Sequence, residues 1–306
     1  METERGIVTW LKNPDRLVSV DEILPNWAAQ TISVSIDRPQ QHAAPIELLG
    51  RIRRAWGTRL KRSASPEGFA GEPCPWDPPC ARDIFFNEQF RFSPSHGLPK
   101  PYVFSMDVER HRLDIRLTLF GAGIDYAYAA REALVEALRS GVSWEEHERP
   151  VDHSVANAEI LTCRMAPQLP DEISPDCTRL RISFLTPLKL RGADPADQPS
   201  TLVARMARRT ENMLRWMGCG LEAEWAHYSQ AWKALDYHIA DEGRELVQQT
   251  SRRQRKSYEV EATRLTLEVE GNLAPLIPFL ACAQTCNVGG MADAGFGRFR
   301  LQQGRD

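Results

Sequence analysis

Arginine and lysine gather in two stretches of this chain that contain no acidic residue, and their side chains suit the binding of phosphate groups. The stretches cover residues 51–62 and 252–256. Their cations are Arg51, Arg53, Arg54, Arg59, Lys61, Arg62, Arg252, Arg253, Arg255 and Lys256. One such run is more often a solvated helix face or turn. Because the whole chain has a formal net charge of −3, repeated acid-free runs leave a locally positive surface that favours a polyanionic partner.

A glycine-rich stretch near the C-terminus, residues 288–299, also suits a phosphate chain. Glycine accepts positive φ and has no Cβ to keep a ligand away from the backbone amides. The framing residues are Gly289, Gly290, Gly295, Gly297 and Arg298. Such loops also form purely structural turns. A Walker loop is absent, because the chain has no Gly-Lys-Ser/Thr at the end of this stretch. A dinucleotide-binding fingerprint needs a strand before the loop and a helix after it, whereas here a helix is expected before the loop and a strand after it.

Hydrophobic periodicity predicts the elements that position these residues. In the first half, the predicted elements are strand 31–37, helix 46–62, strands 102–108 and 112–120, helix 126–139 and strand 156–164, with a Pro/Gly-rich insertion at 63–101. In the second half they are strand 178–186, helix 202–216, hairpin strands 257–262 and 263–269, helix 273–285 and strand 298–302, with an insertion at 222–255 that has its own helical stretch. Each half therefore has the order βαββαβ.

This repeated order predicts an α+β chain of tandem ferredoxin-like domains followed by the glycine-rich loop. The predicted boundaries are an N-terminal extension at 1–30, a first domain at 31–170 and a second at 171–306. The aromatic pattern of RNA-recognition motifs is absent, so stacking of bases on a sheet face is not expected. Phe296 and Phe299 are expected to be core residues.

Composition places the chain among soluble globular proteins, with 306 residues, 42% of them hydrophobic and 26% charged. We expect no membrane span and no secretory signal. Seven scattered cysteines, an odd number, favour a reducing compartment and hence the cytoplasm. Cys74 and Cys80 could form half of a zinc site, but no Cys-x-x-Cys pair is present and a structural zinc needs four ligands. No metal or cofactor is therefore expected.

Several segments in order resemble the RAMP superfamily, and within it the sixth Cas family of CRISPR repeat-RNA endoribonucleases. The glycine loop is similar to the superfamily's C-terminal signature. The family's other motifs are matched by residues 251–256 with 270–276, 48–61, 117–121 and 182–188. The resemblance covers the chain from about residue 31 to 301 and is carried by the order of the pieces.

The resemblance implies an enzyme that cuts precursor CRISPR RNA inside each repeat and stays bound to the mature guide RNA. Family members use no metal: a base activates a ribose 2′-hydroxyl, which attacks the adjacent phosphate to give a 2′,3′-cyclic phosphate and a 5′-hydroxyl. Such chemistry needs a group that titrates near neutrality and fixed cations for the phosphorane charge. Other Cas proteins of an effector complex are implied as partners.

The catalytic residue of many relatives lies near the start of the first helix, which selects His42 here. Arg38 and Arg51, close by, are further candidates, although arginine acts mainly by stabilising charge. His96, His227 and His238 remain alternatives, as does a site with no histidine. Two other functions also stay open: a non-catalytic RAMP subunit that binds guide RNA, and a ferredoxin-like metabolic enzyme or structural protein, for which the sequence holds little support.

Overall fold

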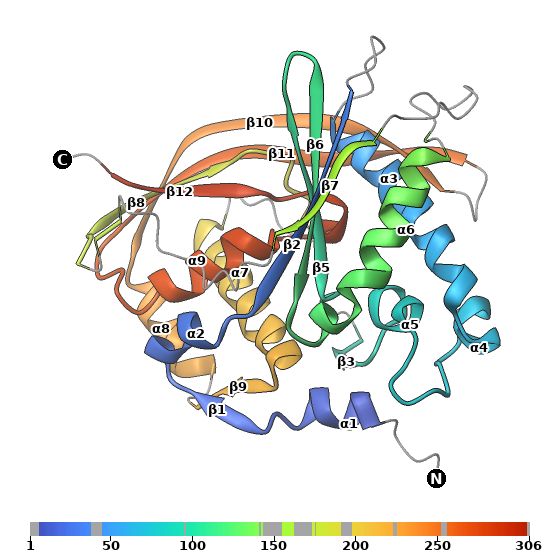
Figure 1. The fold of residues 1–306 in the computed structure, drawn as a ribbon. Helices are drawn as coiled ribbons and strands as arrows, with labels where there is room; N and C mark the ends of the chain where they lie inside the picture. The colour runs from blue at the N-terminus through green and yellow to red at the C-terminus, as the bar shows by residue number, and fades with distance from the viewer. Residues whose placement is uncertain are drawn as a thin grey trace. The chain divides into compact units, whose positions relative to one another are not determined.

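The computed structural model describes residues 6–37, 45–94, 96–140, 142, 155–161, 173–174, 176–190, 198–222, 225–251 and 256–304 (Figure 1). The chain forms two compact units. The first contains residues 1–13, 29–164 and 248–258, and the second contains residues 14–28, 165–247 and 259–306. Among the described residues, no helix is both long enough and apolar enough to cross a bilayer.

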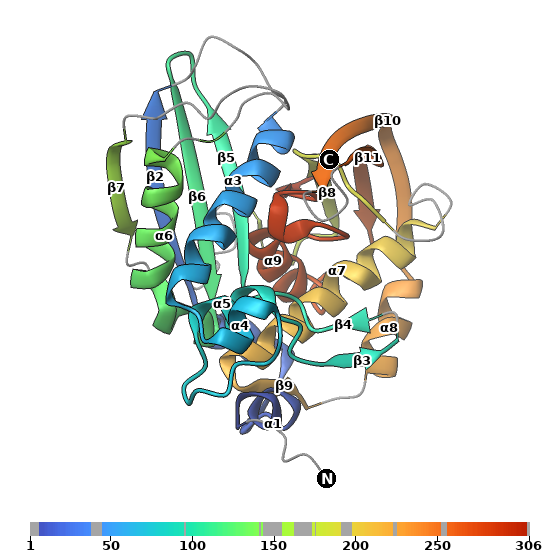
Figure 2. The ribbon, with the colours of Figure 1, turned by 90° about the vertical axis from the view of Figure 1, so that its right-hand side faces the viewer.

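The first unit is built on a four-stranded antiparallel sheet of order β5-β6-β2-β7. Its strands are β2 (Ala29–Asp37), β5 (Tyr102–Val108), β6 (Arg112–Phe120) and β7 (Val155–Leu161). Helices α3 (Pro45–Leu60) and α6 (Ala127–Arg139) cover one face of this sheet, as Figure 2 shows. Alternate residues of β2 and β6 are buried on that face, as the period of two requires. Trp56 of α3 is fully buried and its Nε1 donates to the carbonyl of Ala130 on α6 at 3.0 Å.

The insertion of the first unit folds into short elements that are held together by hydrogen bonds to one buried carboxylate, that of Asp83. These elements are α4 (Pro66–Ala70), α5 (Ala81–Phe86), β3 (Arg91–Ser93) and β4 (His96–Gly97). The Asp83 carboxylate is fully buried and accepts from the backbone N–H of Cys74 and from the side-chain amides of Asn87 and Gln89. Three donors offset the cost of burying its charge.

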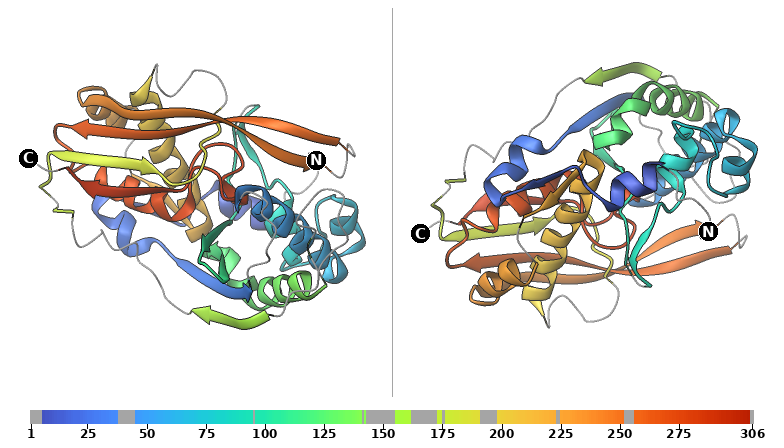
Figure 3. Two further views of the ribbon diagram at one scale, coloured as in Figure 1. Left: turned by 90° about the horizontal axis from the view of Figure 1, so that it is seen from above. Right: turned by 90° about the horizontal axis from the view of Figure 1, so that it is seen from below.

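The second unit has a second four-stranded sheet, of order β10-β11-β8-β12 (Figure 3). Its strands are β8 (Arg179–Phe184), β10 (Asp236–Ser251), β11 (Lys256–Glu270) and β12 (Phe299–Gln303). Helices α7 (Pro199–Leu214) and α9 (Ile277–Cys286) pack together, with the buried Thr210 hydroxyl donating to the Phe279 carbonyl at 2.7 Å. In both sheets, the first and third strands of the βαββαβ order are the central pair.

One predicted hairpin is wrong. Residues 257–262 and 263–269 form a single strand, β11, and its partner β10 comes from the segment predicted as an insertion. Along β11 the apolar residues change from even-numbered to odd-numbered positions between Ala262 and Leu265, and the buried positions change with them. This change in the sequence pattern suggested a turn. Strand β10 is an edge strand exposed along most of its first half, so its sequence lacks apolar alternation. The helical stretch predicted in the same insertion is confirmed as α8 (Trp225–Lys233).

Two further boundaries differ from the prediction. Helix α9 begins at Ile277 rather than at residue 273, which leaves Pro275 before the helix and Pro278 in its first turn. The first 30 residues are not a separate extension. Helix α1 (Gly6–Lys12) falls in the first unit, whereas β1 (Arg16–Val18) pairs in parallel with β9 (Cys219–Leu221) in the second. Trp27, beyond α2 (Ile23–Asn26), donates to the Thr285 hydroxyl at 3.1 Å.

Candidate nucleic-acid interface

Several of the predicted site residues lie outside the described part of the chain, but their flanking elements are described. Arg38 and His42 lie in the segment between β2 and α3. Arg252, Arg253 and Arg255 lie in the segment between β10 and β11, and Lys256 begins β11 without a described side chain.

The end of the β10–β11 hairpin packs against the first turns of α3. The backbone N–H of Gln248 donates to Oε1 of Glu47 at 3.1 Å. One turn further along α3, a Cβ on Gly50 would lie 2.7 Å from Oε1 of Gln249, whose side chain is only 4% exposed. Glycine therefore permits this close approach. The strand that leads into the second basic run is thus brought to the helix that holds the first, within one compact unit.

The cations of α3 do not form one continuous face. Nε of Arg53 donates to the hydroxyl of buried Tyr102 at 2.8 Å, with its guanidinium 5.1 Å from the centre of the Phe86 ring. Arg59 and Arg62 both form ion pairs with Glu136 of α6. These three arginines therefore have packing and pairing roles within the unit.

Other cations of the run are placed differently. Lys61 lies over the exposed Phe69 ring, 4.8 Å from its centre. Arg51 follows Glu47 by four residues, and Arg54 follows Gly50 by four, so both share the helix face that the hairpin end approaches. Arg51, a predicted catalytic residue, and Arg54, a predicted RNA-binding residue, therefore lie on the face of α3 that Gln248 and Gln249 approach.

His96 precedes one end of the first sheet, whereas the chain leaves β2 toward His42 at the opposite end. Asp37 pairs with Arg112, so the segment holding His42 leaves β2 beside the turn of the β5–β6 hairpin. His96 precedes β5, whose first residue Tyr102 pairs near the other end, where Ala29 faces Phe120. Strand β2 has nine residues and spans about 30 Å. The strand β5 that His96 precedes therefore begins at the opposite end of the sheet from the last residue of β2, Asp37, which leads to His42.

The prediction from sequence missed His111, which occupies the turn between β5 and β6. Its side chain is exposed, and the turn is closed by the backbone N–H of Glu109 donating to the carbonyl of Arg112 at 2.9 Å. Two adjacent predicted strands meet at this turn, and the register of β6 on β2 brings it beside the end of β2, from which the chain continues to His42. His111 could have been recognised as a neighbour of this end of β2 only from the register of the two strands, which a single sequence does not reveal. His238 is exposed at the start of β10, the far end of that strand from the basic turn.

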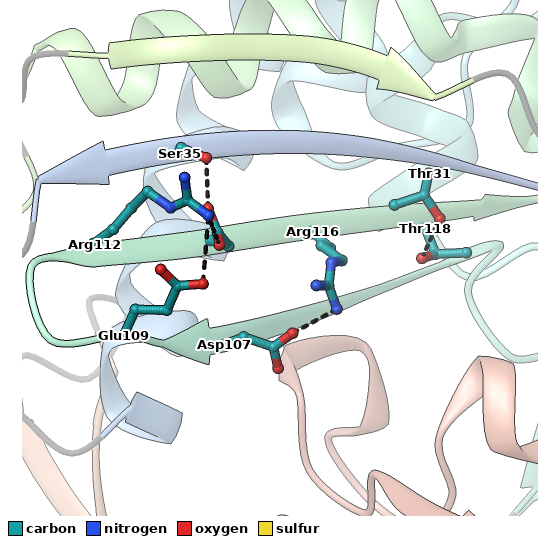
Figure 4. A network of polar contacts seen from close by, with 8 residues as sticks. Thr31, Ser35, Asp107, Glu109, Arg112, Arg116 and Thr118 are labelled. Atoms are coloured by element: carbon teal, nitrogen blue, oxygen red, sulfur yellow. Dashed lines mark hydrogen bonds and ion pairs between the residues drawn. The ribbon is translucent and has the colours of Figure 1, made fainter.

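Figure 4 shows the sheet face of the first unit that faces away from α3 and α6. Its charges pair with one another: Arg116 with Asp107 at 2.6 Å, and Arg112 with Asp114 and Glu109. The Thr31 and Thr118 hydroxyls lie 3.0 Å apart across the two strands. Apart from the buried Phe120 at the end of β6, the described positions of this face in β2, β5 and β6 include no aromatic residue. These positions therefore offer no exposed ring on which a base could stack.

The glycine loop is fastened to the segment that follows β8. The N–H groups of Gly290 and Gly297 donate to the carbonyls of Lys189 and Pro187 at 2.7 and 2.8 Å. The Thr186 hydroxyl donates to the Gly295 carbonyl and accepts from the Arg298 N–H, each at 2.8 Å. These amides therefore close the loop itself instead of pointing at a ligand. Phe296 and Phe299 are buried, which confirms them as core residues.

Steric contacts explain two of the loop's glycines. Gly289 has φ +84°, and a Cβ there would lie 2.6 Å from the Lys189 carbonyl oxygen. Gly297 has φ +66°, and its Cβ would collide with the carbonyl of Val288. Gly295 also has positive φ, at +95°. Support of RNA by this loop, and contact with the partly exposed Arg298, remain predictions.

We expect Gly297→Ala to lower the free energy of unfolding by at least about 2 kcal/mol, because the left-handed backbone and the clash add together. Gly290→Ala is the matched control, since a Cβ there would meet the Lys189 carbonyl oxygen at 3.5 Å, an ordinary contact. Urea unfolding monitored by tryptophan fluorescence measures both. Equal stabilities of the two variants would contradict the structural account of the loop.

The cysteines of the insertion lie close together in the protein interior. Cys74 and Cys80 are both buried, and the N–H of Cys80 lies 3.4 Å from Sγ of Cys74. Burial raises the pKa of the Cys80 thiol, whereas hydrogen bonds from Ser65 and from the Cys80 and Trp76 amides outweigh burial and lower the pKa of Cys74. Among the described residues, no group of three or more His, Cys, Asp or Glu side chains is placed to hold a metal ion.

Comparisons with known proteins bear on the fold. No protein-family model matches the chain, and no curated protein sequence matches it. Solved structures do match. The product complex of Cas6 (TTHB231) is 14% identical with a TM-score of 0.52, covering 89% of this chain and 99% of that one. Thermus thermophilus Cas6 (TTHB231) is 12% identical with a TM-score of 0.52, covering 90% and 98%.

A different Cas6 gives the same result. The product complex of Cas6 (TTHA0078) is 15% identical with a TM-score of 0.51, and the match covers 90% of this chain and 99% of that chain. Nearly the whole length of each structure is therefore matched, and the fold is shared although few residues are. The chain has the fold of the Cas6 CRISPR RNA-processing endoribonucleases, the family that its motifs resemble.

Proposed function

We propose that this protein is a metal-independent endoribonuclease that cuts precursor CRISPR RNA within its repeats and stays bound to the mature guide RNA. The observation that carries the proposal is the match to solved Cas6 structures over nine-tenths of the chain. The contacts of Gln248 and Gln249 with Glu47 and Gly50 support it, because they bring the strand that leads into the second basic run to the helix that carries the first, and phosphate binding needs clustered cations. The two sheets with their helices are inferred to be tandem ferredoxin-like domains.

The proposed site lies at the end of the first sheet where β2 leads into α3. His42 acts as the general base on the ribose 2′-hydroxyl, and Arg38 and Arg51 stabilise the charge that builds on the phosphorane. His111, in the adjoining β5–β6 turn, is a candidate for the acid that protonates the leaving 5′-oxygen. The nearby residues Arg252, Arg253, Arg255 and Lys256 hold the RNA backbone, and the glycine loop supports it elsewhere.

Cleavage of a cognate repeat RNA tests the proposal. With purified protein in excess EDTA, we expect one cut whose products carry a 2′,3′-cyclic phosphate and a 5′-hydroxyl. A substrate with 2′-deoxyribose at the scissile nucleotide should bind but stay intact, because the attacking oxygen is missing. Cutting of that substrate would refute the mechanism. Tight, salt-sensitive binding with no cut of any repeat would instead assign the protein as a non-catalytic guide-RNA-binding subunit.

A further inference from the structure

Three aromatic rings gather on the small hairpin of β3 and β4 in the insertion of the first unit. The rings of Phe90 and Phe92 meet edge to face with centroids 4.9 Å apart, and the ring of His96 lies 5.7 Å from that of Phe92. Phe92 is nevertheless 42% exposed, and the side chain of His96 is exposed too. We call these three residues the aromatic hairpin.

The aromatic hairpin lies outside both four-stranded sheets. Strands β3 and β4 pair only with each other and join neither four-stranded sheet. The burial of the insertion comes from other side chains, such as Phe85 and Asp83 on α5. A lone two-stranded hairpin is marginally stable in water. Clustered rings left in solvent on such an element are more typical of a binding surface than of packing.

Basic side chains lie beside the aromatic hairpin. Residues 87–100 contain a single acidic residue, Glu88, and three basic ones, Arg91, His96 and Lys100. Glu88 is already paired with Arg91 at 2.8 Å. Nζ of Lys12, on α1, lies 6.0 Å from the centre of the Phe90 ring. Exposed rings among cations are the combination that binds single-stranded nucleic acid, with bases stacked on the rings and phosphates held by the cations.

We propose that the aromatic hairpin is a second RNA contact, at which an unpaired base stacks on Phe92 while its phosphates lie near Arg91 and Lys12. The nucleotide must be unpaired, because bases inside a duplex hide their faces. The hairpin leads into β5 at the end of the sheet opposite to the segment of His42, so this contact holds RNA away from the scissile phosphate. The inference rests on the proposed function in taking RNA as the ligand.

The test measures RNA affinity by fluorescence anisotropy for the full-length protein and three variants. The two probes are a short single-stranded RNA with 2-aminopurine at one position and a blunt RNA hairpin. Phe92→Ala should weaken binding of the single strand by about 5- to 150-fold, the loss expected for one stacked base. Binding of the blunt hairpin should stay within about twofold. The quenching of 2-aminopurine by wild-type protein should fall with the same variant, because quenching reports stacking.

Two variants serve as controls. Phe92→Tyr keeps an aromatic face and should bind both RNAs as the wild type does. Tyr128→Ala removes a side chain that is 74% exposed on α6 of the same unit, and it should leave both affinities unchanged. Thermal melting of each variant should match that of the wild type, because Phe92 and Tyr128 are exposed.

The outcomes separate this inference from the proposed function. Unchanged single-strand affinity of Phe92→Ala, or equal losses for both RNAs, would overturn the inference and leave repeat cleavage untouched. A protein that fails to cut repeat RNA, yet loses single-strand binding with Phe92→Ala alone, would retain the inference and lose the proposed function.

Discussion

His42→Ala is expected to lower the rate of repeat-RNA cleavage by about 100- to 10,000-fold, which is the usual contribution of a positioned general base. The affinity for RNA should change by less than about threefold, because phosphate contacts rather than this imidazole supply most binding energy. Single-turnover cleavage at saturating protein measures the rate, and anisotropy with a 2′-deoxy substrate measures the affinity. The split between rate and affinity is what distinguishes a catalytic role from a structural one.

His96→Ala is the matched control for this prediction. His96 is an exposed histidine of the first unit that precedes β5 at the end of the sheet opposite to Asp37, so the cleavage rate at saturation should stay within about twofold of wild type. His111→Ala tests the adjoining turn and should also slow cleavage if that side chain supplies the acid. A His42→Ala variant that cleaves at the wild-type rate would exclude the residue as the base and shift the assignment to another group at this end of the sheet.

Replacing Arg252, Arg253, Arg255 and Lys256 together by glutamine is expected to cause the largest loss of RNA affinity. Each lost phosphate contact reduces the slope of log K against log salt by about 0.7 to 0.9, so four contacts reduce it by roughly 3. Titrations across a series of KCl concentrations measure this slope. The sequence of the RNA should matter little to the size of the effect, because backbone contacts carry no base information.

The control for this variant removes cations from the same sheet. Arg179, Arg181 and Arg264 lie on β8 and β11, and each forms an ion pair with a glutamate. Their replacement by glutamine should leave the salt slope within about one unit of the wild-type value. An equal fall in slope for both sets would show that the protein binds RNA through general charge and not through the turn beside α3.

The sequence predicted the first unit well because its signals are local. Strands 102–108 and 112–120 match β5 and β6 at every boundary, and helix α3 ends within a turn of its predicted end. In these segments one face is buried and the other is not, so apolar residues recur in the sequence with the same period as the buried positions in the structure. The prediction failed at β10, because an edge strand with little buried side-chain surface leaves no such record.

The sequence by itself determined the element order, the acid-free runs and the positions where glycine is required, all of which are properties of neighbouring residues. The tertiary structure decided which of these features meet. It alone placed Gln248 and Gln249 against Glu47 and Gly50, some 200 residues apart in the chain. It also directed the Arg53 side chain to a hydrogen bond with the Tyr102 hydroxyl. It also set His111 beside the end of β2 and His96 at the other end. The physical reason is that strand register and packing partners depend on contacts between distant residues, which local periodicity does not encode.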